Sequence, residues 1–305
     1  MFSVVMAVYN ESPSDLRQSI RSVLVQTCKD FEFIIVVDNP ENVVLKNVVN
    51  EFLAVDTRIK VLVNDKNRGL AYSLNRGIEQ ATGDYIVRMD ADDVAKTDRL
   101  EVLSAFIDGE TDVYFSKYNL IDEEGRFLNT SHSMPKRDSI LKMALKYKCI
   151  INHPTVMLKK ETALKFRYND LHKNEDYDLW VRLVAAGCKF KGIDAVLLDY
   201  RVRSGSMSSL DYYADYFALV YMWKYYKKNE GANLTREIYL KALGEKTEER
   251  KRFNASASRY FEIVYGRQTR TLGDYSRLGL LLVKNPALSR FFFRSVMAAV
   301  IRRCG

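Results

Sequence analysis

Three carboxylates stand at the end of an apolar segment, in the stretch Met89-Asp90-Ala91-Asp92-Asp93. Residues 85–89 before them have the composition of a buried strand. Side chains alternate along an extended segment, so Asp90 and Asp92 should point to the same side, into the crevice where parallel sheets bind ligands. Two like charges repel each other, and Mg²⁺ or Mn²⁺ with oxygen ligands would relieve that repulsion. A cation held by one or two carboxylates keeps open positions, which a diphosphate would fill.

The elements that position these carboxylates follow from the periodicity of the first ninety residues. Apolar, β-branched runs at 4–8, 31–37, 59–63 and 85–89 predict four strands. Amphipathic segments lie between them, and the first has a cap signature, Ser12-Pro13-Ser14-Asp15. Strands that alternate with helices predict an α/β protein with a mostly parallel, doubly wound sheet, because each crossover returns over a face of that sheet.

The pattern is less regular after Asp93. Further strands are predicted over 113–120 and 155–158, with an edge strand over 195–202. From residue 211 onward the chain is expected to be helical, with aromatic residues at helical intervals that are more typical of core than of a binding surface. We also predict helices over residues 98–108, 139–148 and 176–186, and a turn over residues 123–126.

Composition and size are those of an ordinary globular protein. The chain has 305 residues, of which 47% are hydrophobic, and no run of eighteen apolar residues, so we expect no spanning helix. Residues 3–8 have the pattern of a strand with no basic region before it, so we expect no signal peptide. The cysteines have no CxxC spacing, which argues against a zinc site or a disulfide framework and favours a reducing cytoplasm. They are Cys28, Cys149, Cys188 and Cys304.

The positive charge is concentrated in the C-terminal part of the chain. Residues 206–305 contain 18 Lys or Arg against 9 Asp or Glu, a net charge of +9, which leaves about −1 for the rest of the total of +8. A basic region of this kind favours an anionic partner, such as a membrane surface or a nucleic acid, or forms a solvated helical face. Residues 288–303 are too short and too rich in arginine to cross a bilayer. They suit either the plane of the membrane interface or packing onto the preceding domain.

Taken together, these motifs resemble the GT-A glycosyltransferases of the large inverting family 2, especially bacterial members that build capsule, exopolysaccharide or lipopolysaccharide. Several motifs occur in the order of that family over residues 2–208. The resemblance implies a GT-A domain over 1–208, with a nucleotide-sugar half at 1–93 and an acceptor half at 94–208. Residues 209–305 would be a basic, aromatic-rich helical extension that could associate with a membrane.

The resemblance implies how the first two strands would hold the donor. The backbone at Ala7 and the side chains of Tyr9 and Glu11 would hold the base and the ribose. Asp38 would accept a hydrogen bond from N3 of uracil. The family usually continues Asp-Asp-Gly-Ser here, whereas this chain has Asp38-Asn39-Pro40-Glu41, so the loop departs from the family pattern.

Asp90-Ala91-Asp92 matches the DxD motif of the family. By that match Asp92 would bind Mn²⁺ or Mg²⁺, and Asp90 would contact the ribose or share the ion. Ala91 belongs to the donor site, and Asp93 would support the other two acids from behind.

The segment Asn67-Arg68-Gly69-Leu70 matches the start of the third helix of the family. Here Arg68 would reach the diphosphate, and Gly69 would allow close approach of the donor.

The acceptor side of the resemblance lies in Glu175-Asp176-Tyr177-Asp178-Leu179-Trp180. Asp176 is the predicted general base, because an acceptor hydroxyl is a poor nucleophile and must lose its proton to a nearby carboxylate as it attacks. Glu175 and Trp180 are candidate acceptor contacts. Asp178 is predicted to be an acid of the first helical turn that interacts with the macrodipole.

Two further motifs complete the match. His153, in a family turn near the acceptor site, could contact the acceptor or the phosphates, or could be a structural histidine. Residues 200–208 resemble a loop that closes over the donor, where Arg201 and Arg203 would offset the developing charge of the diphosphate.

The resemblance therefore implies an inverting transferase that moves a sugar from a UDP-linked donor to a lipid-linked or growing glycan, at the cytoplasmic face of the plasma membrane, with no nucleic-acid partner. A catalytically inactive scaffold protein of the same family is the main alternative. A phosphatase of the haloacid dehalogenase type also uses a DxD motif, but nothing on an early strand supplies its nucleophile. A dinucleotide oxidoreductase would need a GxGxxG motif after residues 4–8, and none is present.

Overall fold

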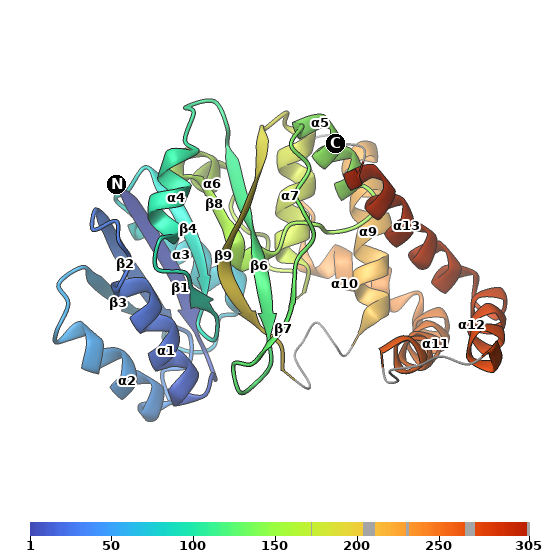
Figure 1. Cartoon of the computed structure of the whole chain (residues 1–305), viewed down its shortest axis with the longest axis horizontal. Coiled ribbons are helices and arrows are strands. Elements are labelled where there is room, and N and C mark those ends of the chain that lie inside the picture. The colour runs from blue at the N-terminus through green and yellow to red at the C-terminus, as the bar shows by residue number, and fades with distance from the viewer. Residues whose placement is uncertain (172, 204–210, 230–231, 266–271, 304–305) are drawn as a thin grey trace.

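The computed structural model describes residues 1–171, 173–203, 211–229, 232–265 and 272–303 (Figure 1). A nine-stranded sheet runs through the first two thirds of the chain, in the order β3-β2-β1-β4-β8-β6-β9-β5, with β7 paired to β6. The strands are β1 (Phe2–Val8), β2 (Phe31–Val37), β3 (Ile59–Val63), β4 (Tyr85–Asp90), β5 (Val94–Ala95), β6 (Val113–Ile121), β7 (Phe127–Thr130), β8 (Val156–Lys159) and β9 (Phe190–Arg201).

Helices lie on both faces of this sheet and continue as a helical extension. The helices of the sheet region are α1 (Pro13–Leu24), α2 (Val43–Leu53), α3 (Leu70–Gln80), α4 (Arg99–Ala105), α5 (Asp138–Leu145), α6 (Lys160–Phe166) and α7 (Glu175–Ala185), with a 3₁₀ turn at His153–Thr155. The extension contains α9 (Tyr212–Lys228), α10 (Arg236–Gly244), α11 (Thr247–Tyr265), α12 (Leu272–Lys284) and α13 (Pro286–Arg303).

The period of two along the strands separates two hydrophobic cores. In β1, Val4 and Met6 pack with Leu16 of α1 on one face, whereas Val5 packs with Leu74 of α3 on the other. All five side chains are at most 2% exposed, and each contributes about 1.5–3 kcal/mol by burial. The alternating pattern of the sequence therefore produces a three-layer α/β/α arrangement.

Local signals placed α1 and α3 where the sequence predicted them. Ser12 caps α1 by accepting a hydrogen bond from the Asp15 N–H at 3.1 Å. In α3, a Cβ atom at Gly77 would lie 2.6 Å from Cγ1 of Val5 and 3.3 Å from Cγ2 of Val36. The missing side chain lets α3 lie close against β1 and β2.

The second half of the sheet differs from the first. Strands β1 to β4 pair in parallel, as predicted, whereas β8 is antiparallel to both β4 and β6. The strand expected at the edge, β9, begins earlier and lies between β6 and the two-residue β5, so the edge prediction was wrong. Strand β7 was missed, because its four residues carry too little pattern to separate from the preceding turn.

The helical extension shares a core with the sheet region. Leu219 of α9 and Ile301 of α13 belong to the same hydrophobic cluster as β6 and α7, and α13 runs back to lie against α5 (Figure 1). The aromatic side chains of α9 pack inward, as predicted: Tyr216 stacks on Phe253 of α11 with ring centroids 5.4 Å apart. The predicted domain boundary after residue 208 falls outside the described residues. Side chains before and after this boundary pack in the same hydrophobic cluster. None of the described helices is both long enough and apolar enough to cross a membrane.

Candidate active site

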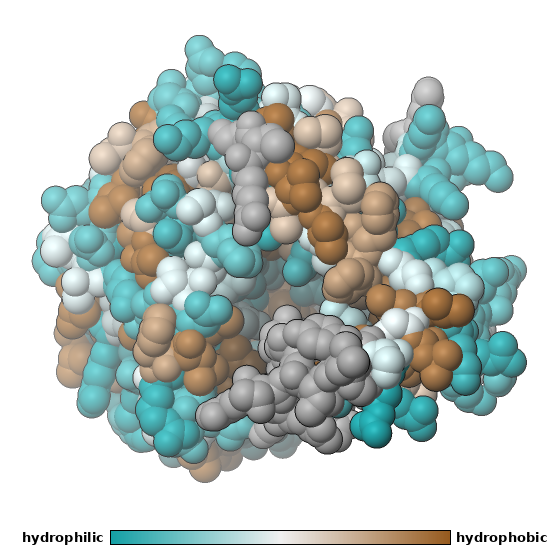
Figure 2. Space-filling view, turned by 45° about the vertical axis from the view of Figure 1, so that its right-hand side comes forward, coloured by the Kyte–Doolittle hydropathy of each residue, from teal (hydrophilic) through white to brown (hydrophobic). Residues whose placement is uncertain are grey.

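A cleft of about 820 Å³ lies at the carboxyl ends of β1 and β4 and extends to the first turn of α7. The face of the molecule drawn in Figure 2 has a hollow near its centre. The cleft brings together nine of the residues predicted from the sequence: Tyr9, Glu11, Asp90, Asp92, His153, Glu175, Asp176, Arg201 and Arg203. Segments separated by more than 160 residues in the chain therefore form one site.

The carboxylates at the end of β4 differ in their exposure. The side chains of Asp90 and Asp92 are 31% and 27% exposed, whereas Asp93 is fully buried. Burial and the charge of Asp90 raise the pKa of Asp92 to about 6, against the opposing effect of Arg203. Burial also raises the pKa of Asp93 well above its usual range. Oδ1 of the buried Asp93 accepts a hydrogen bond from the Arg201 N–H at 2.8 Å, and its support of the other two acids stays a prediction.

Arg201 is buried and holds the end of β9 to the turn after β4. Its Nε donates to the Asp92 carbonyl oxygen at 2.9 Å, its Nη1 to the Glu123 carbonyl at 2.9 Å, and its Nη2 to Oε1 of Gln18 at 2.7 Å. These bonds leave little capacity for the diphosphate that Arg201 was expected to neutralise. Its role in this structure is to position the turn that carries Asp92.

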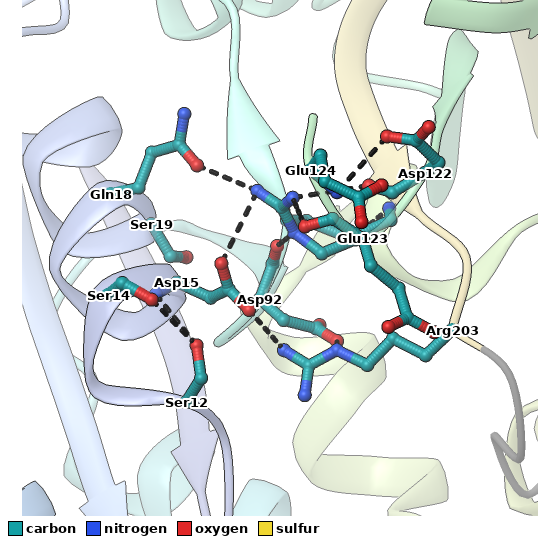
Figure 3. Close-up of polar contacts among 12 residues, drawn as sticks. Ser12, Ser14, Asp15, Gln18, Ser19, Asp92, Asp122, Glu123, Glu124 and Arg203 are labelled. Atoms are coloured by element: carbon teal, nitrogen blue, oxygen red, sulfur yellow. Dashed lines mark hydrogen bonds and ion pairs between the residues drawn. The ribbon is translucent and has the colours of Figure 1, made fainter. Parts of the chain in front are cut away.

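The side chain of Arg203 is 29% exposed, against 2% for Arg201, and it lies between Asp15 and Asp92 (Figure 3). Its Nη2 donates to Oδ2 of Asp15 on α1 at 2.8 Å, and its Nε lies 3.3 Å from Oδ2 of Asp92. The guanidinium thus places a positive charge beside the carboxylate predicted to bind the metal. Residues 204–208 of the predicted closing loop lie outside the described residues.

The donor carboxylates are suited to a hard divalent cation. Among the described residues there is no cluster of three or more His, Cys, Asp or Glu side chains that could hold an ion. Mg²⁺ at nucleotide sites needs only one or two protein carboxylates, because substrate phosphates and water supply the other ligands. Asp92 already attracts one cation, Arg203, and the repulsion between Asp90 and Asp92 is what a divalent ion would relieve. The residues present therefore fit Mg²⁺ or Mn²⁺.

The acid pair at the start of α7 is held by the helical extension. Asn174, just before the pair, has a left-handed backbone with φ of 65°, and its Nδ2 donates to Oδ1 of Asp215 in α9 at 2.9 Å. Burial, and then the charge of Glu175, raise the pKa of Asp176 to about 7. Burial raises the pKa of Glu175 as well. A carboxylate with a pKa near neutrality is well matched to taking a proton from a hydroxyl.

The structure revises the prediction for Trp180 and gives His153 the contacts of a structural histidine. Trp180 is completely buried, so it does not contact an acceptor; its ring instead packs against that of His153, with centroids 6.1 Å apart. Nε2 of His153 is 2.8 Å from the Tyr168 hydroxyl, and burial lowers the pKa of His153 well below its usual range. The histidine is therefore neutral and structurally engaged, although it lines the cleft.

Asp178 does more than complement the helix dipole. It is fully buried and forms an ion pair with Nε of Arg182 at 2.8 Å. It also accepts a hydrogen bond from the Tyr226 hydroxyl at 2.5 Å. These contacts tie α7 to α9, which carries part of the cleft wall.

Asp38 accepts several hydrogen bonds from the residues that lead into α3. This buried carboxylate accepts from Nδ2 of Asn64 at 2.6 Å and from the N–H groups of Arg68 and Gly69 at 2.8 Å each. The uracil contact of Asp38 stays a prediction, as does the diphosphate contact of Arg68, whose guanidinium pairs with Asp65 at 2.6 Å. Gly69 has φ of 87°, a backbone conformation that favours glycine, and, apart from its chain neighbours, no described residue has an atom within 4 Å of its Cβ position. Close approach of the donor at Gly69 stays a prediction.

The residues after β1 form the entrance to the cleft. Tyr9 is 46% exposed, and its N–H donates to Oε2 of Glu11 at 2.9 Å. Burial raises the pKa of Glu11, and the charges of Asp92 and Asp90 add to this effect. Ala7 pairs with Asp90 in the parallel register. The methyl group of Ala91 is buried in the core shared with α1, so Ala91 could contact a donor only through its main chain.

Several cleft residues were not found from the sequence. Arg88 interrupts an apolar strand and could have been noticed as a charge at a core position. The others come from segments without a motif, including the helical extension, and only folding brings them to the site. They include Lys148, Lys173, Asp215, Leu219 and Phe291.

Comparison with known proteins places this arrangement in context. Residues 3–166 match the family model described as "Glycosyl transferase family 2". The UDP-Gal:alpha-D-GlcNAc-diphosphoundecaprenol beta-1,3-galactosyltransferase of Escherichia coli is 33% identical over 206 residues, covering 66% of this chain and 74% of the relative.

Two solved structures share the fold over almost the whole chain. Staphylococcus aureus TarS 1–349 in complex with UDP-GlcNAc has a TM-score of 0.61 at 19% identity, covering 99% of this chain and 89% of that one. Mannosyltransferase PcManGT from Pyrobaculum calidifontis, in complex with GDP-Man and Mn²⁺, has a TM-score of 0.59 at 16% identity, covering 98% and 86%. The predicted fold class, an α/β GT-A fold with a C-terminal helical region, is confirmed.

Proposed function

Because this chain belongs to glycosyl transferase family 2 and is a glycosyltransferase, we propose that it moves a sugar from a UDP-linked donor to a hydroxyl of a lipid-linked or growing glycan, with inversion at the anomeric carbon. One observation carries the proposal. The donor-side carboxylates, Asp90 and Asp92, share a single cleft with the acid pair Glu175 and Asp176. A displacement from the face opposite the nucleotide needs groups for the leaving diphosphate and for the incoming hydroxyl in one cavity.

Asp176 is the general base of the proposed reaction. It would take the proton of the acceptor hydroxyl while that oxygen bonds to the anomeric carbon and the bond from this carbon to the diphosphate oxygen breaks. The nucleoside diphosphate leaves with the bonding electrons, and an α-linked donor gives a β-linked product. The raised pKa of Asp176 supports this role, because its conjugate acid forms readily near neutral pH. Glu175, beside it, is the candidate acceptor contact.

Asp92, with Asp90 beside it, would hold Mn²⁺ or Mg²⁺. Such a bound ion offsets the negative charge that collects on the leaving diphosphate. Arg203, which is 29% exposed and already lies beside Asp92, is the side chain best placed to add positive charge there. Tyr9 and Glu11 would contact the nucleoside at the entrance of the cleft.

The proposed biological setting is the synthesis of bacterial surface polysaccharide at the cytoplasmic face of the plasma membrane. The E. coli relative supports it, since the name of that protein gives a diphosphoundecaprenol acceptor. Helix α13 supports membrane association, because one side packs on α5 while Phe293, Val296 and Val300 on another side are 59%, 44% and 49% exposed. Spacings of three, four and seven residues put them on one face, and Arg302 and Arg303 follow in the same helix.

Donor binding and stereochemistry test the proposal. UDP-galactose, UDP-GlcNAc and GDP-mannose are first screened by thermal shift with and without Mn²⁺, since a ligand that binds the folded state raises its melting temperature. Transfer from the best donor to a synthetic GlcNAc-diphospholipid is then followed, and the product's anomeric configuration is read by proton NMR. We expect a β-linked product. We also expect that a UDP-sugar binds in preference to the other donors, and that Asp92→Asn abolishes this binding.

A matched pair of variants addresses the base. Asp176→Asn should keep donor binding and slow transfer by about 10²-fold or more, whereas Asp170→Asn, on an exposed ion pair with Arg236, should transfer normally. A product with retained configuration would exclude the single displacement. Normal turnover by Asp176→Asn would remove Asp176 from its role, and donor binding without any transfer would favour the inactive scaffold.

A further inference from the structure

Arg88 is a charged side chain in the middle of a buried strand. It lies on β4 opposite Val5 of β1, on the face of the sheet that α3 covers, where the neighbouring positions are apolar. The residue is only 3% exposed, yet it lines the cleft. Burying a guanidinium is costly unless it is paired and hydrogen-bonded, so its presence at a core position requires a reason.

The contacts of Arg88 inside the protein are incomplete. Its Nη1 forms an ion pair with Oδ1 of Asp90, and its Nε has no hydrogen-bond partner among the residues that the structure describes. Arg99, the other deeply buried arginine nearby, also has an unpaired Nε, but both of its terminal nitrogens are used. Its Nη2 donates to the carbonyls of Arg88 at 2.9 Å and Pro154 at 2.8 Å, and its Nη1 to Sδ of Met89 at 3.3 Å. Arg99 is thus held by the fold, whereas Arg88 keeps unfilled donors.

Arg88 also lines the same cleft as both groups of acids. It is anchored to Asp90 on the donor side. On the acceptor side, its charge opposes the rise of the pKa of both Glu175 and Asp176. In a displacement between a diphosphate at Asp92 and a hydroxyl at Asp176, the group that occupies the space between them is the transferred sugar.

We propose that Arg88 is a sugar-binding residue on the floor of the cleft, where its guanidinium, held in place by Asp90, donates hydrogen bonds to oxygens of the sugar that is transferred. The inference rests on the proposed function, since it names a contact of the same donor. Sugar hydroxyl oxygens accept hydrogen bonds readily, and a bound sugar would meet the part of Arg88 that lines the cleft. Arg88 would then distinguish a nucleotide-sugar from its nucleotide.

Binding of UDP and of a UDP-sugar, each with Mn²⁺, tests this assignment by calorimetry. The ratio of the two dissociation constants reports on the sugar alone, because both ligands use Asp92 and the nucleoside contacts. For Arg88→Gln we expect the ratio of the UDP-sugar constant to the UDP constant to rise about tenfold or more, as for the loss of a charge-assisted hydrogen bond. Arg88→Lys, which keeps the charge, should recover part of this loss.

Arg99→Lys is the matched control, because it alters a buried arginine of the same region that does not line the cleft. It should lower the melting temperature and leave the ratio unchanged. An equal loss of UDP and UDP-sugar affinity in the Arg88 variants would refute the sugar contact while leaving the proposed function standing. Wild-type protein that binds none of the nucleotide-sugars would contradict the proposed function itself.

A crystal of the wild-type protein with UDP-sugar and Mn²⁺ serves if the variants do not fold. We expect a nitrogen of Arg88 within about 3.2 Å of a sugar oxygen. A sugar bound elsewhere in the cleft, away from Arg88, would overturn the assignment.

Discussion

Replacing Asp176 by asparagine should make the protein more stable while removing its activity. The folded protein holds the Asp176 proton up to a pH of about 7, whereas an unfolded chain loses it near 3.8. Between these values the folded state binds more protons, so the free energy of unfolding decreases as the pH rises through that interval. Above it, the native protein carries the full cost of a buried, ionised carboxylate beside Glu175. Asparagine cannot ionise, and its side-chain oxygen can still accept the hydrogen bond from the Tyr177 N–H.

The structure sets the magnitude of this gain. At 1.36 kcal/mol per pKa unit, the difference between 3.8 and about 7 corresponds to about 4 kcal/mol. Asp176 shares its environment with Glu175, which would ionise more easily once the neighbouring charge is removed. We therefore expect about 1–3 kcal/mol of added stability at pH 8, or a rise in melting temperature of about 1.5 °C for each kcal/mol in a chain of 305 residues.

Thermal unfolding of wild type and Asp176→Asn, at pH 4 and at pH 8, checks the prediction. The two proteins should melt at the same temperature at pH 4, where the wild-type acid is protonated, and the variant should melt later at pH 8. Asp170→Asn, whose side chain is 53% exposed, should show no such dependence. A variant that is less stable than wild type at pH 8, or a difference that does not change with pH, would refute the reasoning about burial.

Three further predictions concern the packing of α3, the turn after β4 that carries Asp92, and membrane binding by α13. Gly77→Ala should lower stability by about 1–3 kcal/mol, because its Cβ would collide with Val5; an unchanged urea midpoint would show that α3 shifts freely. Arg201→Ala should cost about 2–5 kcal/mol, because it leaves the carbonyl oxygens of Asp92 and Glu123 without their donor; a cost below 1 kcal/mol in denaturant titration would contradict that role. Phe293→Ser combined with Val296→Ser should reduce co-sedimentation with anionic vesicles at an unchanged melting temperature; equal sedimentation would argue against membrane binding by α13.

Elements with a strong local signal were predictable from the sequence. The four strands of the first half were located to within two residues, since continuous apolar runs identify buried parallel strands. The Ser12 cap located α1. The short strand β7 and the interior position of β9 were not predictable, because pairing partners depend on residues distant in the chain.

The sequence identified the site residues that belong to motifs. It did not predict which of these side chains would be buried or already hydrogen-bonded. The residues Asp92 and Asp176 were identified from their motifs, and the structure places both in one cleft. Trp180 belongs to the same motif as Asp176, yet the α-helix turns it into the core. Arg201 was expected to be free for the diphosphate, but the carbonyls of the turn after β4 occupy its donors.

The sequence by itself determined the α/β order of the chain, the family resemblance and the two groups of acids, because these depend on residue types and spacings along one strand or one helix. Tertiary structure alone decided which charges became buried, which arginines kept free donors, and that α9 and α13 form part of the cleft wall. The physical reason is that desolvation and hydrogen-bond pairing depend on all neighbours in space. A carboxylate such as Asp176 acquires a pKa near neutrality only when distant segments of the chain close around it.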